Sequence, residues 1–285
     1  MINHLCVIGV GLIGGSLALA LKKSGYVKKV TGLGRSLDNL QQAKKLGIID
    51  NFETDYVKAI SHADMVFVAV PLGAMADVFA KIEPYLQKHA IVTDGGSAKH
   101  SVIDVATQNL GIKIHQFVPG HPIAGTEKSG AESAFDSLYE SRRVILTPLE
   151  ENSDFAVKSV RDMWQAAGAQ VDEMGARHHD LVLAGTSHLP HVLAYALVDC
   201  LNNVDDVDEI FKYAAGGFRD FTRIASSDPV MWRDICLHNS EAILAMMHNY
   251  QKQLDDLKEA IHDSDAEKIL QLFQDAKNAR DEFSM

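Results

Sequence analysis

Short apolar runs alternate with amphipathic stretches along the first 120 residues of the chain. Five of these runs predict buried strands, at 5–10, 28–35, 65–70, 90–95 and 114–120. Helices are predicted over 12–25 and 36–47, because Gly25 and Gly47 stand where helices commonly end. Strands that alternate with helices form a parallel sheet covered on both faces, so the pattern predicts a doubly wound α/β domain.

Two more apolar runs, at 142–148 and 169–174, flank a helical stretch near 154–167 and are predicted to extend the same sheet. After about Gly175 the pattern contains no further strand. Helices are predicted at about 178–203, 206–226, 231–261 and 264–283. A helix-only segment of this size cannot complete a sheet. We therefore predict a first domain over 1–175 and an all-helical domain over 176–285.

The charge balance narrows the class of partner. The 285 residues carry a net charge of −11, which argues against binding to nucleic acid or to an anionic membrane. The apolar run 5–21 has no preceding Lys or Arg and is interrupted by glycines, so it is interpreted as strand, loop and helix rather than as a signal segment. No other stretch is expected to be long enough to span a membrane. An anionic substrate remains compatible with local arginines.

Cysteine usage indicates the compartment. The three cysteines, Cys6, Cys200 and Cys236, form no Cys-x-x-Cys pair and are odd in number. They predict no disulfide framework and are interpreted as small buried side chains, so a reducing, cytoplasmic location is expected.

A glycine motif follows the first predicted strand and opens the first predicted helix. Gly9, Gly11 and Gly14 form G-x-G-x-x-G around Leu12 and Ile13. In this context the first glycine permits the turn, the second lets backbone approach a pyrophosphate and the third allows helix and strand to pack closely. The five residues predict a Rossmann-type dinucleotide site. The alternative is that the glycines serve only a tight turn.

The second strand indicates which dinucleotide is bound. NAD sites usually place Asp or Glu about 20 residues after the glycines, to accept from the ribose 2′-OH. Here that position holds Gly34, followed by Arg35 and Ser36, which suit a 2′-phosphate. We therefore favour NADP over NAD. Asp38 would approach the ribose if the register were shifted.

The loop GHPIAGTEKSG (120–130) follows the fifth predicted strand and carries His121. Ligands of open α/β sheets bind at the carboxyl ends of the strands, where DGGSAK (94–99) also places Ser97 and Lys99. Pro122 holds His121 in an extended conformation. His121 is therefore a candidate functional residue, and the alternative is a surface histidine.

Histidines and arginines cluster in the helical region. Residues 178–191 contain four histidines, which are His178, His179, His188 and His191. His188 and His191 are three residues apart and can share a helix face. No metal site is predicted, because no cysteine lies nearby and Pro190 separates the last two.

Residues 216–234 bring three arginines, Arg219, Arg223 and Arg233, near Trp232. In an acidic chain this composition suggests recognition of a carboxylate. The alternative is a solvated helix face with ordinary ion pairs.

Taken in order, GVGLIGGSLALAL, DGGSAK, GHPIAGTEKSG, SHLPH and GFRDFTRIASSDPVMWRDI resemble the prephenate/arogenate (cyclohexadienyl) dehydrogenase family of tyrosine biosynthesis. The resemblance extends over nearly the whole chain. It implies an N-terminal dinucleotide-binding domain and a helical substrate-binding domain that forms a homodimer. It also implies oxidative decarboxylation of prephenate to 4-hydroxyphenylpyruvate, or of arogenate to tyrosine, with hydride transfer to NAD(P)⁺.

The resemblance also implies roles for individual residues. His121 matches the catalytic histidine that accepts the hydroxyl proton, and Ser97 matches a serine that hydrogen-bonds this histidine and the substrate. Arg223 matches an arginine that binds a substrate carboxylate. Further substrate-binding positions are implied at His191, His188, Thr126, Glu127, Asp220 and Trp232.

Two other functions fit parts of the pattern. A β-hydroxyacid dehydrogenase shares the predicted architecture but typically relies on a lysine in the helical region. A non-catalytic NADP-binding sensor needs the glycine loop but not Ser97, His121 and Arg223 together. The sequence leaves prephenate and arogenate open, although the Glu127 carboxylate would favour the ammonium group of arogenate.

Overall fold

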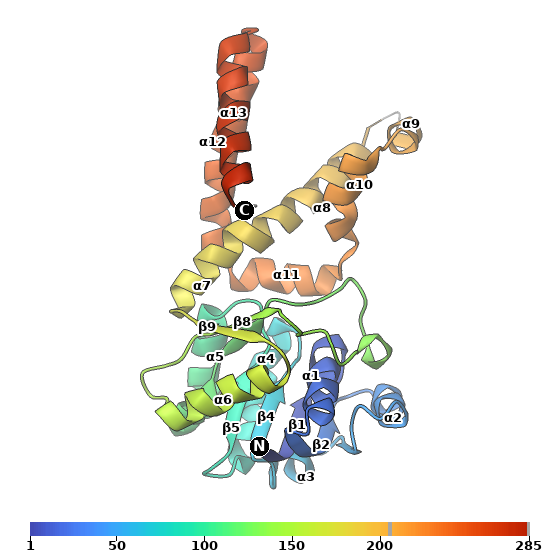
Figure 1. The fold of residues 1–285 in the computed structure, drawn as a ribbon, viewed down its shortest axis with the longest axis vertical. Helices are drawn as coiled ribbons and strands as arrows, with labels where there is room; N and C mark the ends of the chain where they lie inside the picture. Colours follow the sequence, from blue (N-terminus) through green and yellow to red (C-terminus); the bar gives the residue numbers. More distant parts are fainter. Residues whose placement is uncertain (205–206, 284–285) are drawn as a thin grey trace. The chain divides into compact units, whose positions relative to one another are not determined.

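The computed structural model describes residues 1–204 and 207–283 (Figure 1). The first residue of the predicted helix 206–226 and the last two residues of the predicted domain 176–285 lie outside the described residues. The chain divides into two compact units, Met1–Ser240 and Glu241–Met285, which are described separately. The division between residues 175 and 176 stays a prediction.

The first unit is built on a six-stranded parallel sheet with the strand order β3-β2-β1-β4-β5-β6. Its strands are β1 (Ile2–Ile8), β2 (Val27–Leu33), β3 (Asn51–Glu53), β4 (Met65–Val68), β5 (Ile91–Asp94) and β6 (Phe117–Val118). The order reverses between β1 and β4, which is the point where ligands bind in sheets of this kind. The predicted doubly wound sheet is confirmed, with the short β3 as an addition.

Both faces of the sheet are buried. Met65 and Phe67 of β4 join the apolar cluster formed with α1 and α6, where Trp164 packs edge-on against Phe67. Val66 and Val68 are also buried, and strand alternation directs them to the opposite face. The helices of this region are α1 (Leu12–Lys23), α2 (Leu37–Lys45), α3 (Tyr56–Ile60), α4 (Met75–Ile82), α5 (His100–Leu110) and α6 (Asp154–Ala166).

A second sheet, rather than an extension of the first, contains the remaining strands. Its order is β7-β8-β9, with β7 (Gly120–Pro122) antiparallel to β8 (Arg143–Leu146) and β8 parallel to β9 (Gln170–Glu173). The prediction that 142–148 and 169–174 extend the main sheet is therefore wrong. Pro119 follows the two-residue β6 and has no N–H to continue the ladder, so the chain turns away and β8 pairs with β7.

The rest of the described chain is helical, as predicted. It comprises α7 (Ala176–Leu183), the π-helical turn η5 (Ala184–His188), α8 (Leu189–Asn202), α9 (Val207–Lys212), α10 (Gly216–Thr222), the 3₁₀ turn η6 (Arg223–Ser226), α11 (Pro229–His238), α12 (Ser240–His262) and α13 (Ala266–Phe283). Two predicted helices are interrupted. The first breaks before Gly216, and the second breaks at Asn239 between α11 and α12.

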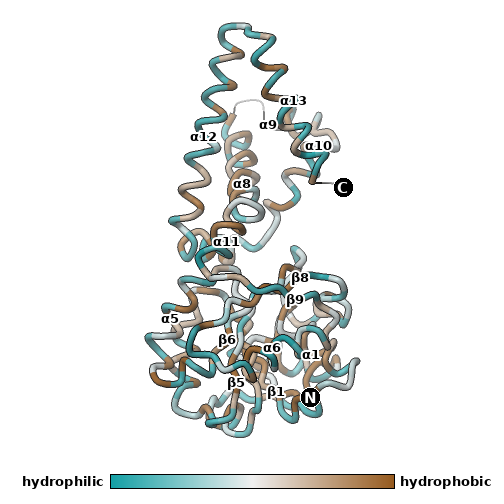
Figure 2. The backbone as a smooth tube through the Cα atoms, turned by 60° about the vertical axis from the view of Figure 1, so that its left-hand side comes forward, coloured by the Kyte–Doolittle hydropathy of each residue, from teal (hydrophilic) through white to brown (hydrophobic). Residues whose placement is uncertain are grey.

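Within the described part of the chain, one helical run is long and apolar enough to cross a membrane by length and composition, and it covers Ala176–Asn202. The expectation that no such stretch follows the N-terminus is therefore wrong. Figure 2 shows the apolar residues along α8. This single run is weak evidence for a membrane span, because core helices of soluble proteins pass the same test.

Candidate active site

The loop between β1 and α1 shows why each of its glycines is needed. Gly9 has φ +92°, and a β-carbon there would lie 2.3 Å from the Ala69 carbonyl oxygen. A β-carbon at Gly14 would lie 2.3 Å from the Gly9 carbonyl oxygen and 2.7 Å from Val7 Cγ1. A β-carbon at Gly11 would meet no described atom within 4 Å. Packing therefore requires Gly9 and Gly14, whereas Gly11 borders open space.

The start of α1 is suited to an anion. Gly11 is its N-cap residue and has no side chain to accept from the first N–H groups, and the first turn has no acidic residue. The N–H groups of Leu12, Ile13 and Gly14 and the positive end of the helix dipole are thus available to a pyrophosphate. The residues present fit a dinucleotide at this edge of the sheet.

The end of β2 carries the two residues predicted to contact a 2′-phosphate. Arg35 is exposed, and no carboxylate of the described residues lies within ion-pair distance of it. The Ser36 hydroxyl accepts from the Asn39 N–H at 3.3 Å, so Ser36 is the N-cap of α2. Asp38 lies in the first turn of α2, one turn beyond the end of the strand.

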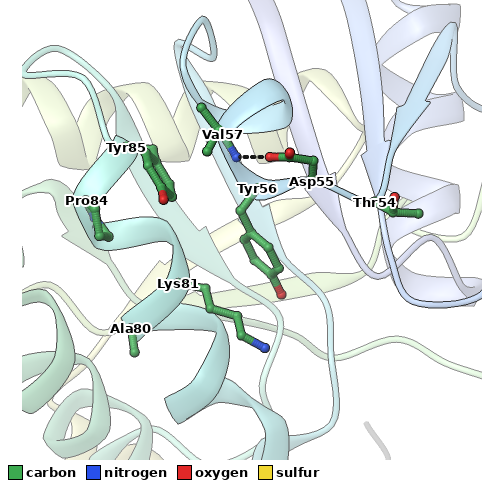
Figure 3. A pocket seen from close by; sticks show the side chains of 8 residues that line it. All are labelled: Thr54, Asp55, Tyr56, Val57, Ala80, Lys81, Pro84 and Tyr85. Carbon is green, nitrogen blue, oxygen red and sulfur yellow. Dashed lines mark hydrogen bonds between the residues drawn. The ribbon is translucent and has the colours of Figure 1, made fainter.

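A second cation lies near Arg35. Lys81 of α4 binds Asp77 at 2.6 Å, and this hydrogen bond raises the pKa of Lys81, while the positive charge of Arg35 opposes the rise. The Lys81 ammonium also lies 5.7 Å from the ring centre of Tyr56. Tyr56 and Lys81 line a surface hollow of about 620 Å³ beside the end of β3 (Figure 3).

A buried ion pair joins β5 to β7. Lys99 Nζ donates to Asp94 Oδ2 at 2.5 Å and to the Gly120 carbonyl at 2.8 Å, and both charged side chains are fully buried. Asp94 also accepts from the N–H groups of Gly96 and Gly120, at 2.8 and 3.0 Å. These bonds fix the strand that carries His121 against the carboxyl edge of the main sheet.

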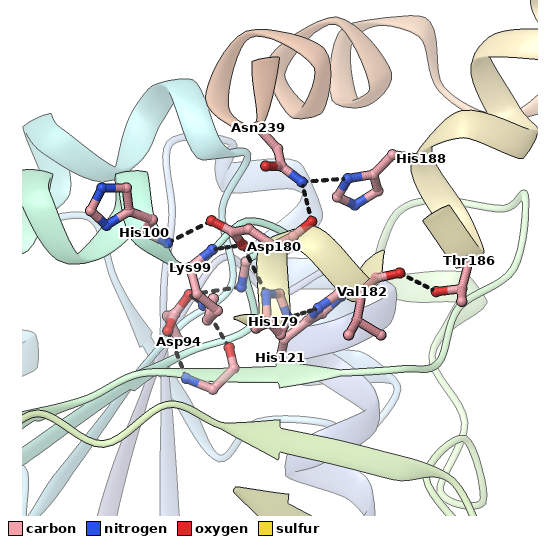
Figure 4. A network of polar contacts seen from close by, with 12 residues as sticks. Asp94, Lys99, His100, His121, His179, Asp180, Val182, Thr186, His188 and Asn239 are labelled. Atoms are coloured by element: carbon pink, nitrogen blue, oxygen red, sulfur yellow. Dashed lines mark hydrogen bonds and ion pairs between the residues drawn. The ribbon is translucent and has the colours of Figure 1, made fainter. Parts of the chain in front are cut away.

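His121 is a strand residue, and its side chain is buried rather than exposed in a loop. It is 8% exposed and lies in β7 opposite Ile145. Its Nδ1 lies 2.8 Å from His179 Nε2, and His179 Nδ1 lies 2.8 Å from Asp180 Oδ1 (Figure 4). Burial foremost, with the neighbouring charge of Lys99, lowers the pKa of His121 well below 6.5. His121 is therefore neutral at neutral pH.

His188 belongs to the same network. Its Nδ1 lies 3.0 Å from Asn239 Nδ2, which also donates to the Asp180 carbonyl at 2.9 Å. Burial lowers the pKa of His188 to about 4. The interruption between α11 and α12 places Asn239 in this position, so the break in the predicted helix serves the network.

The π-turn η5 follows from its sequence. Pro190 has no N–H, and in a regular helix its ring would clash with the carbonyl of Thr186. The wider turn avoids this clash. The His191 ring binds the Ser187 carbonyl through Nδ1 at 2.9 Å, which satisfies one carbonyl at the turn.

Trp232 of α11 contacts the last residue of the turn, His188, and also His191 of α8. The His191 ring stacks on the indole with centroids 3.7 Å apart, and the His188 ring contacts it edge-on at 6.1 Å. Asp234 accepts from the Gly73 N–H at 3.1 Å and thereby ties α11 to the loop after β4. The predicted shared face of His188 and His191 is therefore present.

The remaining predicted site residues make no hydrogen bond to this network among the described contacts. Arg223 and Glu127 form an ion pair with side chains 63% and 38% exposed. Thr126 is exposed beside Glu127, and Asp220 is exposed on α10. Ser97 is half-buried in the loop between β5 and α5, between Asp94 and Lys99 in sequence. Among the described residues, no group of three or more His, Cys, Asp or Glu side chains is arranged to hold a metal.

Comparison with known proteins assigns the family. Residues 17–173 match the prephenate dehydrogenase nucleotide-binding domain, and residues 175–275 match the prephenate dehydrogenase dimerization domain. The chain belongs to the prephenate dehydrogenase family. It is thus an NAD(P)-dependent oxidoreductase of the prephenate/cyclohexadienyl type.

Individual relatives of this family resemble the chain over its full length. The cyclohexadienyl dehydrogenase of Zymomonas mobilis is 39% identical over 98% of this chain and 95% of its own. The prephenate dehydrogenase of Aquifex aeolicus, solved with hydroxyphenyl propionate and NAD⁺, has a TM-score of 0.93 and 39% identity over 99% of both chains. The arogenate dehydrogenase of Synechocystis has a TM-score of 0.83 and 27% identity over 98% of this chain and 99% of its own.

Sequence reasoning assigned no function to several residues of this dehydrogenase's buried network. Asp94, His179, Asp180 and Asn239 were given none, although DGGSAK and the histidine cluster contain the first two. A signal was available for Asp180 alone, as an acidic residue inside an apolar helical stretch. Asn239 carries no signal, because only the fold brings it to His188.

Proposed function

We propose that this chain oxidises and decarboxylates prephenate, arogenate or both, with NADP as the preferred cofactor. The observation that carries the proposal is a buried, neutral His121 at the carboxyl edge of a sheet whose glycine loop fits a dinucleotide. Such an imidazole can accept a proton in a site where water is excluded.

The chemistry follows from the substrate. The ring carbinol loses its hydroxyl proton and a hydride, and its carbon becomes a carbonyl. The bond between the ring and its carboxylate then breaks, CO₂ leaves, and the electron pair makes the ring aromatic. The phenolate oxygen formed takes the proton back, so the proton is lent rather than released. When bound, the nicotinamide accepts the hydride.

His121 is the residue we assign to this proton. Its low pKa keeps the lone pair available at neutral pH, and the returned proton leaves readily for the same reason. Ser97, from the adjacent β5–α5 loop, is assigned a hydrogen bond to the histidine and the substrate hydroxyl. Both roles rest on the family resemblance together with the position of the two loops.

The substrate's carboxylates require cations. Arg223 is the candidate, and its present partner is the carboxylate of Glu127, so the guanidinium is already oriented for an anion. A substrate carboxylate would replace Glu127. The released Glu127 could then accept from the ammonium of arogenate, which prephenate lacks. His191, stacked on Trp232, and His188 are assigned to the substrate ring, and Thr126 and Asp220 are assigned to substrate binding on the family resemblance.

The preference for NADP is supported by Arg35 and Lys81. Two cations near the end of β2, with no carboxylate at the position that usually binds the ribose, favour a 2′-phosphate. Arg35→Ala should weaken NADP⁺ at least about tenfold and leave NAD⁺ within about twofold. Lys81→Ala should act in the same direction but less strongly, because Asp77 already neutralises Lys81.

Homodimer formation is proposed through the helical region. Large apolar side chains are exposed on α12 and α13 of the second unit, among them Leu244, Met247, Leu254, Leu270 and Phe273. They suit contact with a second copy. A cytoplasmic location is proposed as well, because Cys6, Cys200 and Cys236 are all free thiols. The interpretation of all three as buried side chains is wrong, since Cys200 is exposed and Cys236 is half-buried.

One set of assays tests the function. The purified chain is incubated with each of the four pairs of prephenate or arogenate and NADP⁺ or NAD⁺, and reduced cofactor is followed at its absorbance band. We expect turnover with at least one substrate and a higher kcat/KM with NADP⁺. Absence of turnover with all four pairs contradicts the activity, and a higher kcat/KM with NAD⁺ contradicts the cofactor preference.

A further inference from the structure

A line of three side chains leads away from the proposed proton acceptor. His121, His179 and Asp180 are joined by two contacts of 2.8 Å, and His179 is completely buried (Figure 4). Neither His179 nor Asp180 has a role in the mechanism above. When two buried imidazoles form a hydrogen bond, one nitrogen must donate and the other must accept. The contacts with His179 and Asp180 therefore constrain which nitrogen of His121 carries the proton.

The proton positions can be deduced from Asp180 outward. Its carboxylate accepts from the N–H groups of Lys99 and His100, at 2.7 and 2.9 Å, so it acts as an acceptor. His179 Nδ1 must then donate to Asp180 Oδ1. A neutral His179 has no proton left for Nε2, which therefore accepts from Nδ1–H of His121. The remaining nitrogen of His121, Nε2, is left with its lone pair.

Charge considerations agree with this assignment. Burial would raise the pKa of Asp180, but hydrogen bonds from His179 and from two backbone N–H groups outweigh burial and lower it. Burial, as the largest effect, lowers the pKa of His179, which keeps that ring neutral. Lys99 and Asp94 form a pair whose net charge is zero whichever atom holds the shared proton. Asp180 is then the uncompensated negative charge beside the two rings.

We propose that His179 and Asp180 are positioning residues that hold the His121 proton on Nδ1 and so make Nε2 the atom that accepts the substrate proton. The inference rests on the proposed function for its purpose but not for its geometry. When Nε2 takes the hydroxyl proton, the O–H bond breaks, the N–H bond forms, and His121 becomes a cation. Its Nδ1–H then points at His179, whose far side faces the Asp180 carboxylate, so the new charge is compensated through one ring. On return of the proton to the phenolate the line reverts to its starting state.

The carboxylate is well placed to keep this order. Asp180 is fixed from α5 by two backbone N–H groups, and its own carbonyl accepts from Asn239. The two backbone donors and His179 hold both carboxylate oxygens, so the side chain has little freedom to rotate. An aspartate that holds a catalytic histidine in one tautomer is known from Ser-His-Asp enzymes, where its loss costs about 10⁴ in kcat.

The first test needs no substrate. Nitrogen-15 NMR of the full-length protein with labelled histidine distinguishes a protonated ring nitrogen from a bare one, and the His121 signals are identified by their loss in His121→Asn. We expect His121 protonated on Nδ1 and bare on Nε2. The opposite tautomer, which predominates in unconstrained histidine, would overturn the inference and leave the proposed function intact.

The second test compares variants of His179. His179→Leu removes both hydrogen bonds, whereas His179→Gln can place an amide oxygen near the former Nε2 and accept from His121. We expect kcat to fall about 10²-fold or more in the first and within about tenfold of wild type in the second, with KM nearly unchanged in both. His178→Leu is the matched control, since His178 is the exposed neighbour on the same helix. Equal losses in the Leu and Gln variants, or a Leu variant with normal kcat, would refute the positioning role.

Folding is checked in the same variants by melting temperature and by nucleotide binding. If His179→Leu does not fold, the wild-type NMR result alone decides the inference. A wild-type protein without turnover on either substrate would contradict the proposed function, whereas the tautomer of His121 would still stand or fall by its spectrum.

Discussion

The glycine loop after β1 and the histidine network beside β7 lie at the same carboxyl edge of the main sheet but are built in opposite ways. The glycine loop offers backbone N–H groups and depends on the absence of side chains, since β-carbons at Gly9 and Gly14 would meet backbone at 2.3 Å. The network consists of side chains that bond to one another, and most of its members are buried. One region binds a ligand by leaving space, and the other fixes the protons of a single imidazole.

The loop after β5, which leads from Asp94 to Lys99, also approaches the glycine loop. A β-carbon at Gly95, in the loop after β5, would lie 3.2 Å from Ile13 Cγ2 in the glycine loop. The loop that carries Ser97 and Lys99 therefore packs against the start of α1. The loop after β5 can therefore help to position both a bound cofactor at α1 and the proton acceptor His121.

Because the two regions are built separately, we expect a substitution in the histidine network to lower the catalytic rate without weakening nucleotide binding. His121→Asn should lower kcat by about 10²–10⁴, because the proton acceptor is lost, and should leave the Kd for NADP⁺ within about threefold. Stopped-flow or steady-state kinetics and fluorescence titration of the cofactor measure the two quantities. A kcat close to that of wild type would remove His121 from the mechanism.

Burial of the network predicts a stability that depends on pH. His188 has a pKa near 4 when folded and about 6.5 when unfolded, so its burial in the neutral form contributes about 3 kcal/mol above pH 6.5. Below pH 6.5 the unfolded chain binds the proton first, and this stability is lost as the pH falls toward 4. Urea unfolding at pH 7, 5.5 and 4.5 should show the loss.

A variant isolates this contribution. His188→Gln should be less stable at pH 7 but lose less of its stability between pH 7 and 4.5 than wild type does. His178→Gln, at an exposed position, should retain the wild-type slope. Identical pH slopes in all three proteins would mean that His188 is not held neutral in the folded state.

The glycine loop predicts a contrast between two substitutions of the same kind. Gly14→Ala should destabilise the fold by about 1–3 kcal/mol, because the new methyl group would clash with backbone. Gly11→Ala should leave the melting temperature unchanged and weaken nucleotide binding by about tenfold, because its methyl group enters the space meant for the pyrophosphate. Equal effects on stability would show that open space at Gly11 does not distinguish the two positions.

The smallest effect is expected outside both regions. Arg223 is exposed and its ion pair with Glu127 contributes at most about 1 kcal/mol to stability. Arg223→Ala should therefore change the free energy of unfolding little. Because it removes the proposed partner of a substrate carboxylate, it should raise KM for the substrate by about tenfold or more and leave kcat nearly unchanged. Arg143→Ala removes another exposed arginine that is paired with a carboxylate, Asp172, and is the control that should leave KM unchanged. A fall in kcat with constant KM would assign Arg223 to the reaction step instead.

The glycine loop could be predicted from sequence, whereas the histidine network could not. The glycine loop is contiguous, so residues 9–14 and their flanking pattern were sufficient to predict a nucleotide site and the sheet around it. The network joins residues from Asp94 to Asn239, and no local pattern indicates that these two ends meet. His179 is one of several clustered histidines and Asp180 is an acidic residue next to the apolar run 181–184, and neither pattern indicates that the two residues bond to each other and to His121.

The errors in the fold have the same origin. GHPIAG reads as a loop because of its glycines and proline, yet Gly120–Pro122 is a strand that pairs with β8. The sheet break depends on Pro119 and on the availability of β8 as a partner, which are tertiary effects. The interruption at Asn239 lies in an otherwise helical pattern, and only its bonds to Asp180 and His188 explain it.

The π-turn has a consequence for how the chain can vary. A regular helix advances about 100° per residue, so nine residues from His179 would carry His188 about 900°, which is half a turn away from the same side. The wider turn at Ala184–His188 retards that rotation and changes the phase of everything that follows. If these same residues formed a regular helix without the wide turn, every histidine would remain in the chain, but His188 and His191 would be rotated by roughly a quarter of a turn. Deleting one residue of the turn as well would compensate for this rotation, so the site depends on helical phase as much as on composition.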